Sequence, residues 1–360
     1  MPLRYKEVKE LIFNDIVEME PNTRIPSRSQ LCKKYMVTRT TVDRSISELI
    51  GEGHLYSVNG SGTFVADLGE QVEVKRDVLN IGVLLPNIMH DTYPGILRGI
   101  EDTVQKHGMN VIICNTDHNS EKQFSYIKRL INSKVGGIII VPAVSNDQHI
   151  NIYSLLCEAG IPFVFCNRSE GGADSPLVCS NDFYGGYLAT NQLIESGYQR
   201  IAYIEGVHYR VSVDRCQGYL AALWEHNIPV DENLIRSYLN AKTSTRETGE
   251  ELMNQLLDEI TDLDGVFCFN DQMALGAMSA IIKHRKRVSD DIGVIGYDNT
   301  KVCEMIPVKL SSVAFRNYEI GQSAAEIILK MIEHPGEPVN KLTSFCPQLV
   351  VRESCVGKHR

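Results

Sequence analysis

The sequence contains no long apolar run and no leader-like start. No stretch of its 360 residues approaches the roughly 20 apolar residues that a membrane helix needs, and its first ten residues, MPLRYKEVKE, lack the apolar segment of a signal peptide. Its ten cysteines form no CxxC pair, and several lie inside apolar runs such as Phe163–Cys166, where a thiol behaves as a small hydrophobic group. We therefore expect a cytoplasmic protein, in a reducing compartment and away from membranes.

The motifs of common enzymes are missing as well. No GxGxxG follows the first apolar run after residue 78, and GxxxxGK[ST], GxSxG and HExxH do not occur. Cysteine and histidine do not cluster at metal-ligand spacings. We expect no enzyme, no cofactor and no metal; the one enzymatic interpretation left open is a catalytic pair that is assembled only by folding.

Positive charge is scarce overall but concentrated locally. The net charge of −9 argues, at face value, against a nucleic-acid partner. Residues 1–67, however, carry nine basic and nine acidic residues, so the whole excess of acid belongs to the remainder. Residues 22–46 hold six basic residues and one acidic residue, Asp43. The sequence therefore allows a basic face near the N-terminus.

The length and the patterning predict more than one domain. Residues 1–66 read as two helices, a turn, a third helix begun by the N-cap Thr38, and a β-hairpin with the glycine-rich tip Asn59–Gly62. Residues 67–78 form a charged linker. Residues 79–355 alternate short apolar runs with amphipathic helices, which is typical of parallel sheets covered on both faces. Because this part is long for one sheet, we expect an α/β domain of two lobes.

The N-terminal pattern is that of a winged helix-turn-helix. In the third helix Val42, Ile46 and Leu49 would face the core, which leaves Thr40 and Arg44 on the opposite face. Hydroxyls and an arginine there suit phosphate and guanine contacts in the DNA major groove. The alternative is a protein-interaction module whose arginines only solvate its surface.

Three segments of this module resemble the GntR-family DNA-binding domain: Pro26–Leu31, Val37–Val42 and Gly60–Val65. The resemblance implies that double-stranded operator DNA is the partner. The family's pattern usually has Glu-Arg where this chain has Arg28-Ser29, and an arginine where it has Asp43, so we hypothesise that Arg28 and Arg44 take over backbone contacts on an altered operator. The predicted DNA-binding residues are Arg28, Thr38, Arg39, Thr40, Thr41, Arg44, Asn59 and Gly60.

In the C-terminal part, polar residues follow several apolar runs. Because ligands of two-lobed α/β proteins bind outside the carboxyl ends of the strands, these residues are candidates for a cleft. Carboxylate, amide, guanidinium and aromatic groups together suit a neutral polyhydroxylated ligand. The predicted ligand-binding residues are His90, Tyr93, Asn167, Arg168, Phe183, Arg215, Asn270 and Asp298.

Cys268–Met278, Ile295–Asp298 and Asp214–Tyr219 resemble the LacI/GalR effector domain, which has the fold of periplasmic sugar-binding proteins. The resemblance implies that Arg215, Asn270 and Asp298 contact the effector and that the protein is a homodimer. It covers about residues 79–352, and a GntR-type head stands in place of a LacI-type one.

Each candidate also has a structural interpretation. Asp298 could cap a helix or a turn, Asn270 could cap the helix that follows it, and Arg215 could pair with Asp214 or another nearby acid. Tyr93 and Phe183 could be core residues. His107, His118 and His284 read as isolated surface residues.

Together these patterns predict a ligand-responsive transcription regulator. We expect a repressor of a sugar-utilisation operon that leaves its operator when an arabinose-like sugar binds the cleft. One alternative is a purine or a phosphosugar acting as co-repressor. The other is a cytoplasmic sugar-binding protein without operator specificity.

Overall fold

A computed structural model describes residues 5–17, 19–58, 61–66, 79–143, 152–170, 174–206, 210–237 and 245–357. The chain divides into two units, residues 1–77 and 78–360. The predicted linker at 67–78 and the wing residues Asn59 and Gly60 lie outside the described residues.

The first unit has three helices, α1 (Tyr5–Val17), α2 (Arg28–Tyr35) and α3 (Arg39–Gly51), around one apolar core. The predicted capping box starts α2: Ser27 N donates to Gln30 Oε1 at 2.8 Å, and Gln30 N donates to Ser27 Oγ. Met36 ends α2 in the left-handed conformation, with φ 54°. Thr38 then caps α3, so the predicted turn between the two helices is present.

The wing of this unit pairs β1 (Leu55–Val58) with β2 (Gly62–Val65) in an antiparallel register, Leu55 opposite Val65. Thr23 and Ile25 add backbone hydrogen bonds on the other side of β2, so a third segment extends the predicted hairpin. The wing is therefore anchored to the chain that leads into α2.

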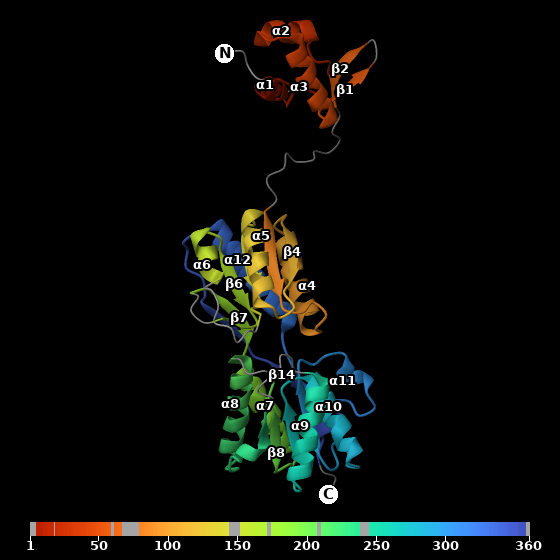
Figure 1. The fold of residues 1–360 in the computed structure, drawn as a ribbon, viewed down its shortest axis with the longest axis vertical. Coiled ribbons are helices and arrows are strands. Elements are labelled where there is room, and N and C mark those ends of the chain that lie inside the picture. The colour runs from red at the N-terminus through yellow and green to blue at the C-terminus, as the bar shows by residue number, and fades with distance from the viewer. Residues whose placement is uncertain are drawn as a thin grey trace. The chain divides into compact units, whose positions relative to one another are not determined.

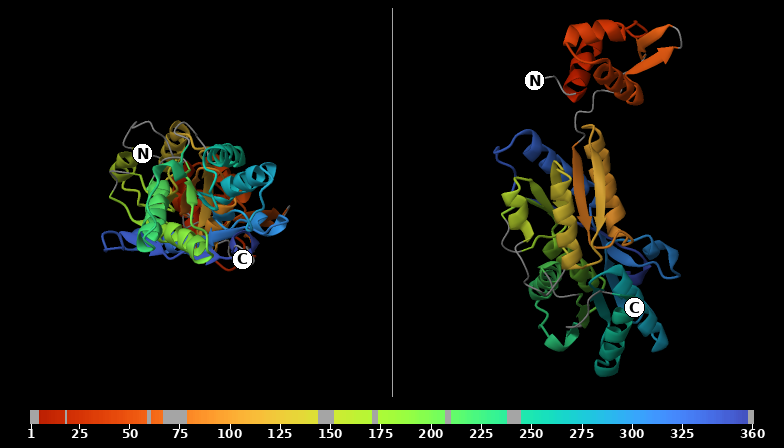
Figure 2. Two further views of the ribbon diagram at one scale, coloured as in Figure 1. Left: turned by 90° about the horizontal axis from the view of Figure 1, so that it is seen from below. Right: turned by 45° about the horizontal axis from the view of Figure 1, so that its top comes forward.

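The second unit contains two lobes, each a six-stranded sheet with helices on both faces (Figures 1 and 2). The first lobe has the strand order β13-β7-β6-β5-β3-β4, all parallel. Helices α4 and α12 cover one face, and α5 and α6 cover the other. Its elements are β3 (Asn80–Leu85), α4 (Thr92–Gln105), β4 (Asn110–Asn115), α5 (Ser120–Asn132), β5 (Gly137–Ile140), α6 (Ile152–Glu158), β6 (Phe163–Cys166), β7 (Leu177–Ser180), α12 (Asn317–Glu333) and β13 (Leu342–Phe345).

The second lobe has the order β14-β12-β11-β10-β8-β9, with only β14 antiparallel to its neighbour. Helices α9 and α10 cover one face, and α7 and α8 the other. Its elements are α7 (Asp182–Glu195), β8 (Ile201–Ile204), α8 (Arg210–Glu225), β9 (Ile235–Arg236), α9 (Arg246–Glu259), β10 (Gly265–Cys268), α10 (Asp271–Lys283), β11 (Gly293–Tyr297), α11 (Val302–Met305), β12 (Ser311–Ala314) and β14 (Gln348–Val350), with short 3-10 turns at Glu232–Leu234 and Glu353–Cys355.

The chain passes between the two lobes three times (Figure 1). The crossings are Asn181 between β7 and α7, Phe315–Arg316 between β12 and α12, and Cys346–Pro347 between β13 and β14. The two lobes are thus joined by three separate connections, and this arrangement permits a hinge movement of the lobes about these connections.

Three helix pairs pack at reciprocal glycines. A Cβ on Gly276 of α10 would lie 1.9 Å from the Arg246 carbonyl oxygen of α9, and one on Gly249 of α9 would lie 2.2 Å from the Met273 oxygen of α10. The same reciprocal contact joins α4 with α12 and α7 with α8, through Gly99, Gly321, Gly186 and Gly218. Only glycine lets these backbones approach so closely.

Candidate functional site

The exposed face of α3 carries most of the predicted DNA-binding residues. Thr38, Arg39, Thr40 and Arg44 are exposed, and Thr41 is half-buried. The hydroxyls of Thr38 and Thr41 lie 2.9 Å apart, and Thr38 Oγ1 also accepts from Thr41 N. The helix cap and the candidate DNA-contacting hydroxyls are therefore the same groups.

Asp43 lies between two arginines. Arg28 Nε donates to Asp43 Oδ1 at 3.3 Å, and Arg39 Nε lies 3.7 Å from Asp43 Oδ2. Arg28 also donates through Nη1 to Thr63 Oγ1 of β2 at 2.7 Å. The two departures from the GntR pattern, Arg28 and Asp43, are thus partners in one ion pair that connects α2, α3 and the wing.

Arg44 has a different environment. Its guanidinium lies 3.8 Å from the centre of the Tyr5 ring of α1, and its Nε lies 3.9 Å from Glu48 Oε1. The side chain is 62% exposed, so its charge still faces solvent. A backbone contact by Arg44 remains a prediction.

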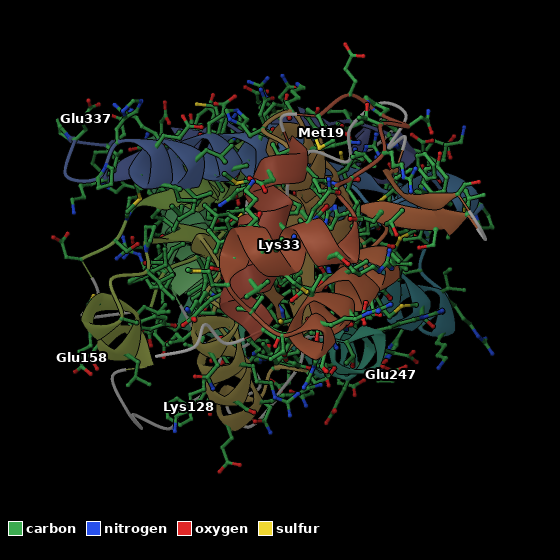
Figure 3. All side chains as sticks on the ribbon, turned by 90° about the horizontal axis from the view of Figure 1, so that it is seen from above. Met19, Lys33, Lys128, Glu158, Glu247 and Glu337 are labelled. Atoms are coloured by element: carbon green, nitrogen blue, oxygen red, sulfur yellow. The ribbon has the colours of Figure 1, made fainter. Side chains whose placement is uncertain are left out.

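Sequence reasoning did not assign a role to Arg24, although it counted the residue in the basic stretch. Arg24 lies against the wing, where a Cβ on Gly62 would come within 2.6 Å of Arg24 Nε. Gly62 has φ 125°, a conformation that glycine adopts without strain. Lys33 adds an exposed charge on α2 (Figure 3).

In the second unit, Arg215 of α8 is buried and held by protein groups. Its Nε donates to Asp182 Oδ1 at 2.9 Å, and its guanidinium lies 3.5 Å from the centre of the Tyr297 ring. Asp214 instead pairs with Arg210. Burial raises the pKa of Asp182, although the charge of Arg215 opposes this. A structural salt bridge is therefore present, and ligand contact by Arg215 stays a prediction.

Asn270 and Asp298 follow neighbouring strands, β10 and β11. Asn270 caps α10, with Oδ1 accepting from Met273 N at 2.9 Å. Asp298 has φ 101° and accepts no side-chain hydrogen bond from the part of the chain that the structure describes. Burial raises the pKa of the Asp298 carboxyl well above its usual range, although Arg215 opposes this. A half-buried acid at this φ, with no protein hydrogen bond to its carboxyl among the described residues, is a candidate for ligand contact.

Hydrogen bonds to the Asp271 carboxylate stabilise the loop that carries Asp298. Asp271 Oδ2 accepts from Thr300 N at 2.7 Å and from Thr300 Oγ1 at 2.9 Å, while Ser312 Oγ donates to Oδ1. Ser312 Oγ in turn accepts from Asn299 N. Sequence reasoning missed this support, because its members come from three separate segments.

On the first lobe, Arg168 donates through Nε and Nη2 to the carbonyl oxygen of Pro142, at 2.9 and 2.7 Å. His90 and His118 lie within its electrostatic reach. Burial lowers the pKa of both histidines and the charge of Arg168 adds to this, although Asp91 opposes the shift at His90. His118 is therefore part of a polar cluster and is not the isolated surface residue that its sequence position indicated.

The remaining candidates differ in exposure. Tyr93 is buried in the core of the first lobe, with its ring 5.7 Å from that of His90. Phe183 is 42% exposed in the first turn of α7. Asn167 has φ 66° directly after β6, so its backbone turns sharply at the end of the strand. His107 and His284 lie at the surface beside Glu333 and Asn254.

Within the described ranges, no group of three acidic, histidine or cysteine side chains could hold a metal ion. In the same ranges, no helix is both long and apolar enough to cross a membrane.

Two family matches divide the chain as its structure does. Residues 4–65 match the bacterial regulatory proteins of the gntR family, and residues 78–349 match the periplasmic binding proteins and sugar-binding domain of the LacI family. The second match spans most of the chain. The chain belongs to this family of periplasmic binding proteins and LacI-type sugar-binding domains, and it carries a GntR-type head.

Several proteins similar to this chain are transcription regulators. The arabinose metabolism transcriptional repressor of Geobacillus stearothermophilus is 29% identical over 359 residues, 98% of this chain and 97% of the relative. The HTH-type transcriptional repressor PurR of Histophilus somni is 30% identical over 276 residues, 76% of this chain and 81% of PurR. A LacI family transcriptional regulator from Enterococcus faecium, solved with bound ribose, has a TM-score of 0.64 and 31% identity over 76% of this chain and 98% of that one.

These similarities confirm the expected fold class, a winged helix-turn-helix followed by a two-lobed α/β unit with parallel sheets. They also confirm that this chain is a transcription regulator with a DNA-binding head and not an enzyme. The effector and the residues that contact it remain to be assigned.

Proposed function

We propose that this protein represses a sugar-utilisation operon in the cytoplasm and leaves its operator when an arabinose-like sugar binds between the lobes. The observation that carries the proposal is Asp298: a carboxylate at the carboxyl end of β11, held in a strained backbone conformation and without a protein hydrogen bond among the described residues. A carboxylate of this kind accepts hydrogen bonds from the hydroxyls of a sugar.

The residues around Asp298 support this choice of ligand. Asn270 follows the adjacent strand β10, and the Tyr297 and Phe269 rings flank the guanidinium of Arg215. The similarity to an arabinose metabolism repressor along nearly the whole chain, and to a regulator solved with ribose, supports a small sugar.

The proposed mechanism couples two sites. A sugar that contacts both lobes favours a closed arrangement about the three crossings, and closure changes how two copies of the chain present their heads to two operator half-sites. A coupling of about 1–3 kcal/mol would change operator affinity roughly 5–150-fold.

A two-fold dimer of this kind needs a self-complementary face, and we place it at α4 and β4. A groove of about 670 Å³ lies there, lined by six apolar residues (Ile88, Pro94, Leu97, Met109, Val111 and Ile113) and four polar ones (Arg98, Glu101, Gln105 and Asn110). β4 is the outer strand of its sheet, and Ile113 on it is 47% exposed. An outer strand with apolar side chains is a surface that a second copy can cover.

The test is a thermal-shift screen of the full chain against free sugars, phosphosugars and nucleobases, followed by gel shifts on DNA that the chain selects from a random pool. We expect arabinose or a related pentose to raise Tm and to release the selected DNA. A shift with nucleobases or phosphosugars alone would overturn the sugar assignment. Failure to select any DNA sequence would leave a sugar-binding protein without operator specificity.

A further inference from the structure

The ion pairs around Asp43 form a continuous link from α3, the predicted recognition helix of the DNA-binding head, to the wing. Arg39 and Asp43 lie one turn apart on α3, Asp43 contacts Arg28 at the start of α2, and Arg28 contacts Thr63 of β2. Thr63 is buried and its hydroxyl lies 3.1 Å from that of Ser57 on β1. The link therefore ends inside the wing.

The exposures of these side chains separate their roles. Arg39 is 79% exposed and Asp43 is 47% exposed, whereas only 34% of the Arg28 side chain is exposed. Arg28 makes its two polar contacts to the protein, with Asp43 and Thr63. Arg28 is thus placed to brace the wing against α3, and Arg39 is the member of the link that is open to DNA.

These ion pairs also explain why a negative charge at Asp43 is tolerated on α3. A lone carboxylate on the DNA-facing helix would repel phosphates, but this one lies between two guanidinium groups, so the trio has a net charge of +1. A carboxylate at i+4 attracts an exposed arginine at i, and this attraction favours the arginine rotamers that bring the two charges together. An arginine that is fixed in advance loses less freedom when it makes a bidentate contact with guanine.

We propose that Asp43 is a specificity-determining residue of the DNA-binding head: it orients Arg39 for base contact and, through Arg28 and Thr63, fixes the wing relative to the recognition helix. This inference rests on the proposed operator binding. It replaces the hypothesis that Arg28 contacts the DNA backbone with a role for Arg28 inside the protein.

The inference makes opposite predictions for specific and non-specific DNA. Asp43→Asn removes a negative charge, so affinity for random-sequence DNA should rise severalfold. Its affinity for the selected operator, relative to random DNA, should fall about tenfold, because Arg39 is no longer oriented. If Asp43 were only an unfavourable charge, both affinities would rise together and their ratio would stay constant.

The matched control is Glu52→Gln. Glu52 directly follows the same helix and pairs with Lys9, which is not a predicted DNA contact, so this variant makes the same change of charge away from the link. We expect it to raise affinity for both DNAs and to keep their ratio. Thermal unfolding of each full-length variant, compared with the wild type, checks that the head remains folded.

Arg28→Gln and the double variant complete the test. Because Arg28 and Asp43 act through one link, Arg28→Gln should lower the ratio about tenfold, and the double variant should lower it no further. Arg28→Gln should also leave the salt slope of binding to random DNA unchanged, whereas loss of a phosphate contact would reduce it by about one.

A constant ratio in Asp43→Asn, or additive losses in the double variant, would overturn the inference while operator binding by the wild type still stands. If the wild type selects no operator at all, it is the proposed function that fails.

Discussion

Asp298 is the residue at which stability and ligand binding make opposite demands. Its carboxyl has a pKa well above the usual range because it is buried, and further carboxylates, including Asp271 and Asp182, add to this. An acid whose folded pKa is raised stabilises the fold least at a pH above that value, because the folded state must then carry an unfavourable charge. At neutral pH, Asp298 therefore lowers the free energy of unfolding.

We predict that Asp298→Asn raises the Tm of the second unit, which we call the effector unit, by roughly 2 °C at pH 7.5. This corresponds to about 1 kcal/mol in the free energy of unfolding. The gain should shrink towards pH 5, because the wild-type carboxyl becomes protonated as the pH falls. The same variant should bind its sugar about 10–100-fold more weakly, since a hydrogen bond to a charged group is lost. Calorimetric unfolding at several pH values and titration calorimetry measure the two effects.

Asp262→Asn is the control, because the Asp262 side chain is 73% exposed. It should change neither the free energy of unfolding by more than about 0.5 kcal/mol nor the affinity for sugar. An Asp298→Asn protein that is destabilised at pH 7.5 would contradict the prediction.

Residue types and positions could be predicted from the sequence more readily than their partners. Position after an apolar run was enough to single out Asp298, Asn270 and Arg168 as candidates. The partner of Arg215 could not be predicted, because Asp182 is 33 positions away and Asp214 is adjacent. The pairing of Arg28 with Asp43 was hidden for the same reason, and both departures therefore looked independent.

At the level of elements, the reciprocal glycines determine how closely the helix pairs pack. In α7 and α8 they also affect the candidate ligand-binding residue Arg215. A Cβ on Gly186 would lie 2.2 Å from the backbone oxygen of Arg215, so only a glycine allows the helices to bring Asp182 and Arg215 together in the interior.

We predict that Gly276→Ala destabilises the effector unit by about 3 kcal/mol, because the added methyl would overlap the backbone of α9. Gly51→Ala is the control: nothing lies within 4 Å of the position, and alanine favours a helix. It should be neutral or stabilising by up to about 1 kcal/mol. Chemical denaturation distinguishes the two, and equal stability of Gly276→Ala and wild type would refute the packing argument.

Elements with continuous apolar runs were predictable, and those with polar or alternating sequences were not. The strand at Ile201–Ile204, a continuous apolar run, could be predicted from the sequence. Strands β7, β12 and β13 were missed, because they are short and each contains serine. All three end directly at a crossing between the lobes.

At the level of the whole molecule, operator binding should depend on the dimer. We predict that Ile113→Asp shifts the protein from dimer to monomer in sedimentation velocity and lowers operator affinity at least tenfold, because a charge would be buried against the second copy. Sugar binding to the monomer should persist. Val230→Asp, at a site that is 50% exposed after α8, should leave the dimer intact. A monomeric wild type, or a dimeric Ile113→Asp protein, would remove α4 and β4 as the dimer face.

The two-lobed architecture was predictable from the alternation of apolar runs and helices, but the path of the chain through the lobes was not. Nothing in the local pattern of Asn317–Glu333 indicates that this helix covers a sheet begun more than 200 residues earlier. Long-range pairing is decided by packing between segments, which periodicity does not encode.

The three crossings have a consequence for folding of the chain during its synthesis on the ribosome. The first lobe is the first part of the effector unit to be synthesised, yet its sheet lacks β13 and one of its faces lacks α12 until nearly the whole chain has emerged. The second lobe, apart from β14, is complete by Ala314 and can fold before it. A nascent chain therefore carries an incompletely covered apolar face until α12 has emerged, and its first sheet is complete only after translation has passed Phe345. Premature termination should yield chains that chaperones and proteases recognise, instead of half-active regulators occupying the operator.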